Sequence, residues 1–332
     1  MGKQPATLSD ESVVDTGDQY TVEDSMTGPV IPELFQSRHA EWIEYLAVEE
    51  GATENTCKTY ARELKRFLNW LEDGPHTIER ETLADYRDDL TGKYSPATVN
   101  LSLVAVRRYL DWLEIEGDIP FNPAARVKGV KDRDRGQIHK RDVLSPAEVR
   151  RVISMIDADT ITGKRDLAIV SAMVYGALRQ SEIQRARIRD YQIERSRNIL
   201  WIREQQDSEP DDYILANPGF NGALTDWMSS HPCADNPGAA LFCSLHPRTY
   251  GNFLTTRHIR RIVKECLLSA GVNDASKTTD SLRHSAIAAV IRAGGSVSQV
   301  QRVARHINPT TTEKYIYDYE RHEDQAEFMI EY

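Results

Sequence analysis

Apolar residues recur at helical spacing in four segments of the first third of the chain, with short polar breaks between them. The last segment has clear end signals, because Ser95 suits an N-cap, Pro96 suits the first turn and Gly117 suits a stop. The predicted helices cover residues 32–50, 53–72, 78–91 and 95–117. This pattern predicts a small all-helical domain over residues 32–125.

A second domain is predicted over residues 144–332. Ser145 and Glu148 have the spacing of a capping box ahead of an apolar helix. Two short alternating runs, 198–203 and 212–215, predict a pair of antiparallel strands. Further helices are predicted at residues 164–175, 256–270, 281–292, 297–305 and 311–319. The chain is therefore expected to be mainly α, with a helical first domain and a mixed, mostly helical second domain that holds a small antiparallel sheet.

The first 31 residues lack apolar periodicity and are rich in Ser, Thr, Asp, Gly and Pro, so we expect an acidic, disordered tail. The formal net charge of the chain is -10. Residues 1–32 contain six acidic residues and one basic residue, Lys3, so this segment carries half of the net negative charge. The net charge therefore does not exclude a nucleic-acid partner, because phosphate binding depends on local positive charge.

The most basic segment lies between the two domains, at residues 126–143. Two interpretations stay open: a solvated linker, or a strap that binds DNA phosphates. Its basic residues are Arg126, Lys128, Lys131, Arg133, Arg135, Lys140 and Arg141.

Composition favours a soluble globular protein, with 40% hydrophobic and 28% charged residues. No apolar run approaches the roughly 20 residues that cross a bilayer, and the N-terminus lacks a signal-peptide layout, so we expect a cytoplasmic protein without a membrane partner. The cysteines Cys57, Cys233, Cys243 and Cys266 form no C-x-x-C pair, which indicates neither a zinc site nor a disulfide framework.

Four motifs in the second domain stand in a fixed order. Arg179 and Glu182 follow Gly176, and Asp280 precedes Arg283 and His284. Further along come Arg305-His306 and Thr311-Thr312-Glu-Lys-Tyr315, so that a tyrosine stands nine positions after a histidine. In this order and spacing the chain resembles the tyrosine recombinases, or phage-type integrases, and in particular the Xer-like proteins, which include archaeal members. The resemblance extends over residues 32–319 and implies a SAM-like, core-binding first domain and a catalytic second domain.

The resemblance implies that Tyr315 attacks a DNA backbone phosphate and forms a covalent phosphotyrosine, with Tyr317 as the alternative if the register differs by two. Arg179, Arg283 and His306 would hold that phosphate, because planar guanidinium forks suit the charge that develops on its oxygens. Glu182, three positions after Arg179, is placed to hold that arginine. His284 is expected to pack beside the site. No metal or other cofactor is implied, because the phosphotyrosine ester conserves the bond energy.

Two positions depart from the family pattern. The family usually has a lysine in the turn between the two strands as a general acid, and residues 203–212 contain none. Lys277, Lys164 or water could replace it. Asp280 stands where the family most often has histidine; it could bond an arginine, accept the proton of Tyr315, or act as the N-cap of the helix that follows. Both changes predict a slower enzyme.

The predicted function is a site-specific recombinase or integrase that acts on double-stranded DNA, by resemblance as a tetramer on two sites. Phe328, Met329 and Ile330 in the C-terminal segment could dock on a neighbouring protomer or belong to a frayed end. The alternative is a cleavage-deficient DNA-binding regulator or architectural protein derived from a recombinase, which the missing lysine and histidine favour and the intact arginines and tyrosine oppose.

Overall fold

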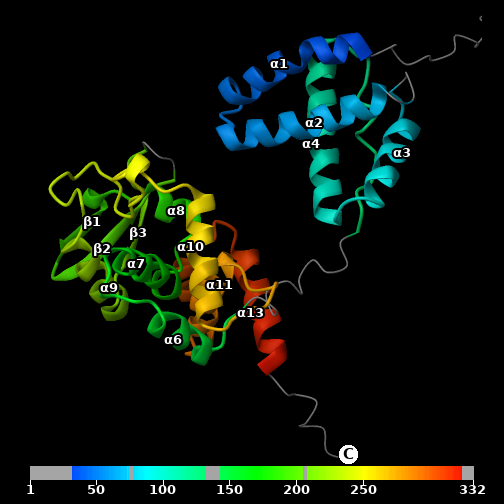
Figure 1. Ribbon diagram of the computed structural model, residues 1–332. Helices are drawn as coiled ribbons and strands as arrows, with labels where there is room; N and C mark the ends of the chain where they lie inside the picture. The colour runs from blue at the N-terminus through cyan, green and yellow to red at the C-terminus, as the bar shows by residue number, and fades with distance from the viewer. Residues whose placement is uncertain (1–31, 73, 75–77, 132–142, 205–207, 324–332) are drawn as a thin grey trace, which may run out of the picture. The chain divides into compact units, whose positions relative to one another are not determined.

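The computed structural model describes residues 32–72, 74, 78–131, 143–204 and 208–323. It divides into two compact units, residues 1–133 and 134–332 (Figure 1). Each unit has a hydrophobic core of its own. Helices predominate in both units, and within the described ranges none is long and apolar enough to cross a membrane. The predicted fold class, mainly α with a small antiparallel sheet, is confirmed.

The first unit consists of helices in the described range 32–131. They are α1 (Pro32–Val48), α2 (Glu54–Glu72), α3 (Arg80–Thr91) and α4 (Pro96–Glu116). The predicted ends of α4 are confirmed, because the Ser95 hydroxyl accepts a hydrogen bond from the Thr98 amide and Gly117 adopts φ 81. Only glycine takes that left-handed conformation without strain. The core is rich in aromatic rings, among them the fully buried Trp42, Phe67 and Tyr109.

The segment after α4 belongs to this helical unit as far as residue 131, although the sequence predicted a linker from residue 126. Val127 is buried in the core, and Asn100 exchanges hydrogen bonds with both the amide and the carbonyl of Val130. Arg107 donates to the carbonyls of Ala124 and Val127. These contacts satisfy backbone groups that a solvated linker would leave to water.

The second unit contains the following elements: α6 (Pro146–Ser154), α7 (Ile161–Gly176), α8 (Gln180–Arg185), η1 (Ile188–Asp190), β1 (Tyr191–Glu194), β2 (Arg197–Ile202), β3 (Asp212–Leu215), α9 (Pro218–Met228), η2 (Pro247–Thr249), α10 (Thr256–Ser269), α11 (Thr279–Arg292), α12 (Val297–Ala304) and α13 (Pro309–Glu323). The predicted capping box is present, because Ser145 and Glu148 each accept the other's amide hydrogen. The sequence missed α8, α9 and β1.

The sheet is an antiparallel meander in the order β1-β2-β3. Leu200 lies opposite both Tyr191 and Ile214, and these residues share the face that packs on the core. The strand β1 escaped prediction because it is four residues long with exposed Gln192 and Ile193, so it carries little alternation.

Helix α7 lies at the centre of the second unit and packs against α9 and α11 (Figure 1). Ala168, Ile169, Ala172 and Met173 on this helix are fully buried. A smaller core lies at its C-terminal end, where Ala177 packs with residues of α11, α12 and α13, including Ile287, Val300 and Tyr315. This second core brings together the helices that carry the sequence motifs.

A buried ion pair anchors the sheet. Arg203 and Asp190 are each about 2% exposed in their side chains, and Arg203 Nε lies 2.9 Å from Asp190 Oδ2. Asp190 Oδ2 also accepts the Arg187 amide at 2.9 Å, and Arg203 donates to the Ser208 carbonyl. Breaking such a pair leaves one charge buried and uncompensated.

We predict that Asp190→Ala lowers the free energy of unfolding of the second unit by about 3–5 kcal/mol, because Arg203 loses its counter-charge. Urea denaturation, with amide hydrogen exchange to assign the unit, measures the change. Asp226→Ala, an exposed aspartate on α9, is the matched control and should change stability by less than about 0.5 kcal/mol. A loss below about 1 kcal/mol for Asp190→Ala would show that water reaches the pair.

Candidate functional site

Five of the motif residues line one cavity of about 440 Å³ in the second unit, whereas Glu182, Arg305 and Tyr315 are not among its lining residues. Its walls come from α8, α10, α11 and the segment between α12 and α13. They consist of Arg179, Gln180, Ser181, Thr256, Arg260, Asp280, Arg283, His284 and His306. Residues separated by more than 120 positions in the sequence, such as Arg179 and His306, therefore share one wall.

Two helix ends hold the arginines of this site. Helix α7 ends at Ala177 and helix α12 ends at Arg305, and both residues adopt left-handed backbone conformations, with φ 50 and φ 47. A side chain in this region costs roughly 1 kcal/mol, and such strain is typical of functional sites. The last carbonyls of both helices lack helical partners and carry partial negative charge. They therefore attract cations.

Guanidinium groups satisfy these carbonyls. Arg283 donates to the carbonyls of Ala177 and Ala304, and so joins the ends of α7 and α12. Arg179 Nη2 donates to the carbonyls of Ala304 and Arg305, at 3.3 and 3.0 Å. Arg283 is 5% exposed, whereas the side chain of Arg179 is 39% exposed. Burial and the neighbouring arginines lower the pKa of Arg283, so a bound anion would be favoured beside it.

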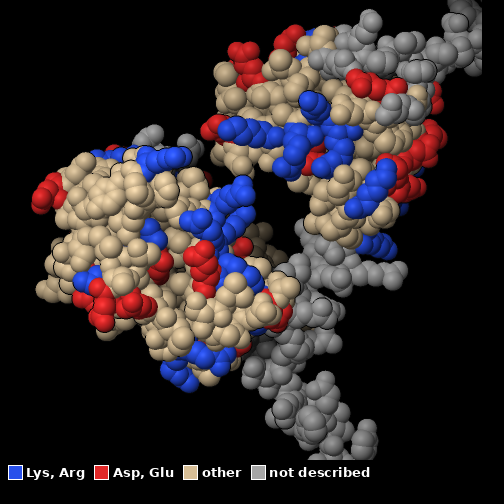
Figure 2. Space-filling view, viewed as in Figure 1, with Lys and Arg blue, Asp and Glu red and all other residues tan. Residues whose placement is uncertain are grey.

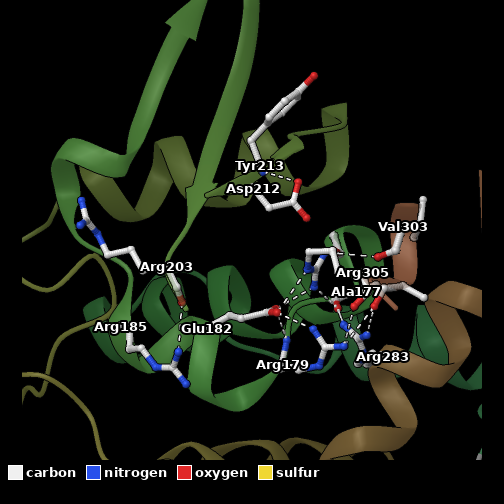
Figure 3. A network of polar contacts seen from close by, with 12 residues as sticks. Ala177, Arg179, Glu182, Arg185, Arg203, Asp212, Tyr213, Arg283, Val303 and Arg305 are labelled. Atoms are coloured by element: carbon white, nitrogen blue, oxygen red, sulfur yellow. Dashed lines mark hydrogen bonds and ion pairs between the residues drawn. The ribbon is translucent and has the colours of Figure 1, made fainter. Parts of the chain in front are cut away.

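Glu182 is the counter-charge, as its spacing from Arg179 predicted. Its carboxylate is 7% exposed and accepts Arg179 Nη1 and the Arg179 amide, each at 2.7 Å. The same carboxylate pairs with Arg305, whose Nη2 lies 2.7 Å from Oε2 (Figure 3). Burial raises the pKa of Glu182, but its pairing with Arg305 and Arg179 outweighs burial and lowers it. Sequence reasoning placed Arg305 in a motif beside His306 but missed its pairing with Glu182, because nothing in the spacing of residues 176–182 points to position 305.

His306 and Tyr315 stand together on α13 and the turn before it. His306 Nδ1 lies 3.0 Å from Oγ1 of the buried Thr312. Tyr315 is 3% exposed, and its hydroxyl donates to the His284 carbonyl at 3.2 Å. Its ring packs edge-on against His284, with the centroids 5.9 Å apart, and 6.5 Å from His306. The hydroxyl of the candidate nucleophile is thus bonded to the backbone of His284, the residue that follows Arg283, and its ring lies inside the small core. Tyr317, by contrast, is 60% exposed.

Asp280 has a partner that the sequence did not predict. Its Oδ1 accepts a hydrogen bond from Gln180 Nε2 at 3.1 Å, and Gln180 Oε1 accepts one from Arg260 Nε at 2.8 Å. The predicted direct bond to an arginine is therefore replaced by a link through Gln180. The N-cap interpretation is wrong, because Thr278 caps α11 and Asp280 lies inside its first turn.

The lysines that were candidate replacements for the missing general acid lie elsewhere. Lys277 donates to the Val143 carbonyl, and Lys164 Nζ lies 3.1 Å from Ser230 Oγ. Neither residue lines the cavity. Arg203, at the end of β2, is held in its ion pair with Asp190. Within the described ranges no group of three or more His, Cys, Asp or Glu side chains is arranged to hold a metal ion.

Basic side chains form a ridge beside the cavity. Arg257, Arg260, Arg261 and Lys264 recur at helical spacing on the exposed face of α10 (Figure 2). Helix α2 of the helical unit has a similar exposed basic face, formed at helical spacing by Lys58, Arg62 and Lys65. Sequence reasoning missed both faces, although the i, i+3, i+4, i+7 spacing of the basic residues was a usable signal.

The basic segment between the units is described only in part. Arg126, Lys128 and Lys131 are exposed on the helical unit. Arg133, Arg135, Lys140 and Arg141 lie outside the described residues, as do Phe328, Met329 and Ile330 of the C-terminal segment.

The charged residues on the cavity wall give the cavity a net positive formal charge. Three arginines and one aspartate line it, which gives a formal charge of +2 with the histidines neutral. The Arg305–Glu182 pair behind the wall adds no net charge. A tetrahedral oxyanion such as a phosphate suits guanidinium donors, and the nearby phenol is a nucleophile toward phosphorus. The fold and the site thus define a protein with a cationic cavity close to a buried tyrosine.

Two known protein-family models match this chain, one in each unit. The model of the phage integrase family matches residues 142–322, and that of the phage integrase N-terminal SAM-like domain matches residues 40–117. The first match covers more than half of the chain. The chain belongs to the phage integrase family.

Individual relatives match over most of their length. A tyrosine recombinase of Synechocystis sp. is 29% identical over 84% of this chain and 91% of its own. The tyrosine recombinase XerD of Lacticaseibacillus casei is 26% identical over 83% and 92%. Among solved structures, the XerH recombinase bound to a palindromic difH substrate has a TM-score of 0.69 at 18% identity, covering 88% of this chain and 83% of that one. A lambda integrase tetramer bound to a Holliday junction has a TM-score of 0.65 at 15% identity, covering 86% and 78%. These structures share the fold.

We predict that sulfate raises the thermal midpoint relative to sodium chloride at equal ionic strength. At a sulfate concentration tenfold above its Kd the gain in stability is about 1.4 kcal/mol, or roughly 3–6 °C for a unit of this size. Scanning fluorimetry measures the shift. Arg179→Ala together with Arg283→Ala should abolish it, and an undiminished shift in that variant would place the anion elsewhere.

The lowered pKa of Glu182 predicts a pH-dependent contribution to stability. A carboxylate whose folded pKa is depressed stabilises the fold above its ordinary pKa of 4.5, and the contribution is lost as the pH falls through the folded value. The free energies of unfolding of the native chain and of Glu182→Gln, measured in urea, should therefore differ most above about pH 5, and the difference should shrink steadily as the pH falls below 4.5. A constant difference down to about pH 3 would contradict this.

Proposed function

We propose that this chain is a site-specific DNA recombinase that cleaves and rejoins duplex DNA through a 3'-phosphotyrosine on Tyr315. One observation carries the proposal: a cavity with a formal charge of +2 gathers Arg179, Arg283 and His306, and Tyr315 packs against two of its histidines. An anion, a nucleophile and a cationic cradle are the components that phosphoryl transfer requires.

The chemistry balances without an external energy source. The phenol oxygen of Tyr315 forms a bond to phosphorus, and the bond between phosphorus and the 5' oxygen breaks. The phosphodiester is exchanged for a phosphotyrosine ester and a 5' hydroxyl. Attack by that hydroxyl, or by one from a second DNA site, reverses the step and releases Tyr315.

Arg179 and Arg283 stabilise the charge that develops on the non-bridging oxygens. Terminal nitrogens of both arginines are held by protein acceptors, and both side chains line the cavity that would receive the phosphate. His306 lies on the same wall and contributes a further imidazole nitrogen. Removing one such donor typically lowers the rate by about 10²- to 10³-fold.

Proton transfer follows from the side chains around the phenol. Tyr315 attacks as the phenolate, and Asp280, held toward the cavity by Gln180, is the carboxylate that we assign to accept its proton. No lysine is among the described residues on the cavity wall, so water supplies the proton to the leaving 5' oxygen. The loss of a positioned acid predicts slow cleavage.

Tyr315 must leave its buried position before it reacts. Its hydroxyl is held by the His284 carbonyl, and its ring contributes to the small core with Ile287 and Val300. Attack on a phosphate in the cavity requires α13 to shift so that this hydrogen bond breaks. DNA binding supplies the free energy for that shift.

The DNA partner is duplex DNA that contacts the basic faces of α2 and α10 and the basic segment at residues 126–143. The relatives that share this fold include a recombinase bound to its substrate and an integrase tetramer on a Holliday junction. We assign a homotetramer on two DNA sites as the active assembly. The cell compartment follows from the substrate and is the cytoplasm.

A nicked suicide duplex tests the proposal, because loss of the short 5'-hydroxyl strand traps the covalent intermediate. The duplex carries the sequence that flanks this gene. We predict a covalent adduct on denaturing gels, with mass spectrometry locating the nucleotide on Tyr315. Tyr315→Phe should yield no adduct, and Tyr317→Phe should yield the native amount.

Specific binding by the native chain without any adduct would contradict the proposal and indicate a DNA-binding regulator instead. An adduct that persists in Tyr315→Phe would assign the nucleophile to another residue.

A further inference from the structure

Arg305 is a buried arginine in a backbone conformation that favours glycine. Its φ is 47, and its side chain is 5% exposed. A side chain there costs free energy that glycine avoids, so its contacts must offset the strain.

All five N–H donors of Arg305 bond to the protein. Nε and Nη2 reach Glu182 Oε1 and Oε2, at 3.2 and 2.7 Å. Nη1 donates to the carbonyls of Gly176 and Val303, each at 3.2 Å, and Nη2 donates also to the Ala177 carbonyl at 2.7 Å (Figure 3). A guanidinium has five donors, so none is left for a ligand. Arg305 is also absent from the wall of the 440 Å³ cavity.

We infer that Arg305 is a positioning residue for the proposed cleavage reaction: it supplies the counter-charge for Glu182, so that Arg179 is oriented by that carboxylate yet keeps its own charge for the phosphate. The inference rests on the proposed function.

The charges explain why one arginine would not suffice. Glu182 is buried and accepts four hydrogen bonds, two from Arg305 and two from Arg179. Without Arg305 the only cation hydrogen-bonded to this carboxylate among the described residues is Arg179, which would be drawn into a closed ion pair. Of the two cations that lower the pKa of Glu182, Arg305 has the larger effect, as expected if Arg305 is its main counter-charge.

Arg305 also fixes the distance between the two helix ends. It shares the Ala177 carbonyl with Arg283 and bonds to Gly176 on α7, while its own backbone ends α12. The next residue is His306. The position of the imidazole relative to Arg179 therefore depends on the same side chain.

The test compares Arg305→Gly with Arg195→Gly in the full chain. Arg195 lies in the β1–β2 turn with φ 48 and is exposed, so its replacement removes the same charge and relieves the same backbone strain. We measure the single-turnover rate of adduct formation at saturating suicide duplex, and separately the Kd for duplex DNA. Arg305→Gly should slow adduct formation about 10- to 100-fold, the usual effect of losing a residue that orients a ligand-binding group, with Kd changed less than about threefold. Arg195→Gly should match the native chain in both.

Two further variants separate positioning from folding. Arg305→Lys keeps the charge without the planar fork and should recover part of the rate. In the Glu182→Gln background, where the carboxylate charge is gone, adding Arg305→Gly should slow the reaction by less than about threefold, because residues that act through one another are non-additive.

The inference would be overturned if the native chain forms the adduct and Arg305→Gly forms it at the native rate. It would also be overturned if Arg305→Gly slows adduct formation by the same factor in the native chain and in the Glu182→Gln background. If the native chain forms no adduct, the proposed function fails, and the sulfate-induced rise in thermal midpoint decides the role of Arg305. Loss of that rise in Arg305→Gly supports positioning, and its retention overturns it.

Discussion

Concentrating positive charge in a nearly buried space is the constraint on which the rest of this site depends. Arg179, Arg283 and Arg305 lie together, and the side chains of Arg283 and Arg305 are nearly buried, so their charges lose most of their hydration. The last carbonyls of α7 and α12 and the single carboxylate of Glu182 offset that cost. The compensation is incomplete, because the cavity wall retains a formal charge of +2. In the proposed function, the DNA phosphate supplies the missing negative charge.

The arginines of the site are held largely by the carbonyl groups at the ends of helices. Helix α7 forms the centre of the second unit, so its end at Ala177 is fixed by the largest core in that unit. The small core below the site joins Ala177 to Ile287 on α11, Ala304 on α12 and Tyr315 on α13. The same apolar contacts thus hold the cationic cradle together and keep the tyrosine withdrawn, so movement of α13 alters the site directly.

Much of this could be read from the sequence, where the signals were local or repeated. The caps at Ser95, Gly117 and Ser145 were predictable because capping depends on neighbouring residues. Arg179, Arg283 and His306 could be placed in one site only through family spacing, since their convergence depends on tertiary packing.

The sequence was least informative where partners are distant or signals short. Arg305 pairs with a carboxylate more than 120 positions away, and Asp280 bonds through Gln180 rather than to an arginine. The strand β1 is too short to show alternation, and the segment around Val127 packs into the helical unit despite its basic composition.

In the proposed function, Arg179 and Arg283 together hold one backbone phosphate. Anomalous diffraction from crystals of the protein soaked in selenate tests this, because selenate is a tetrahedral dianion that marks its own position. We expect a selenium peak in the 440 Å³ cavity, within hydrogen-bond distance of both guanidinium groups. Full selenate occupancy at the basic face of α10 with an empty cradle would contradict it.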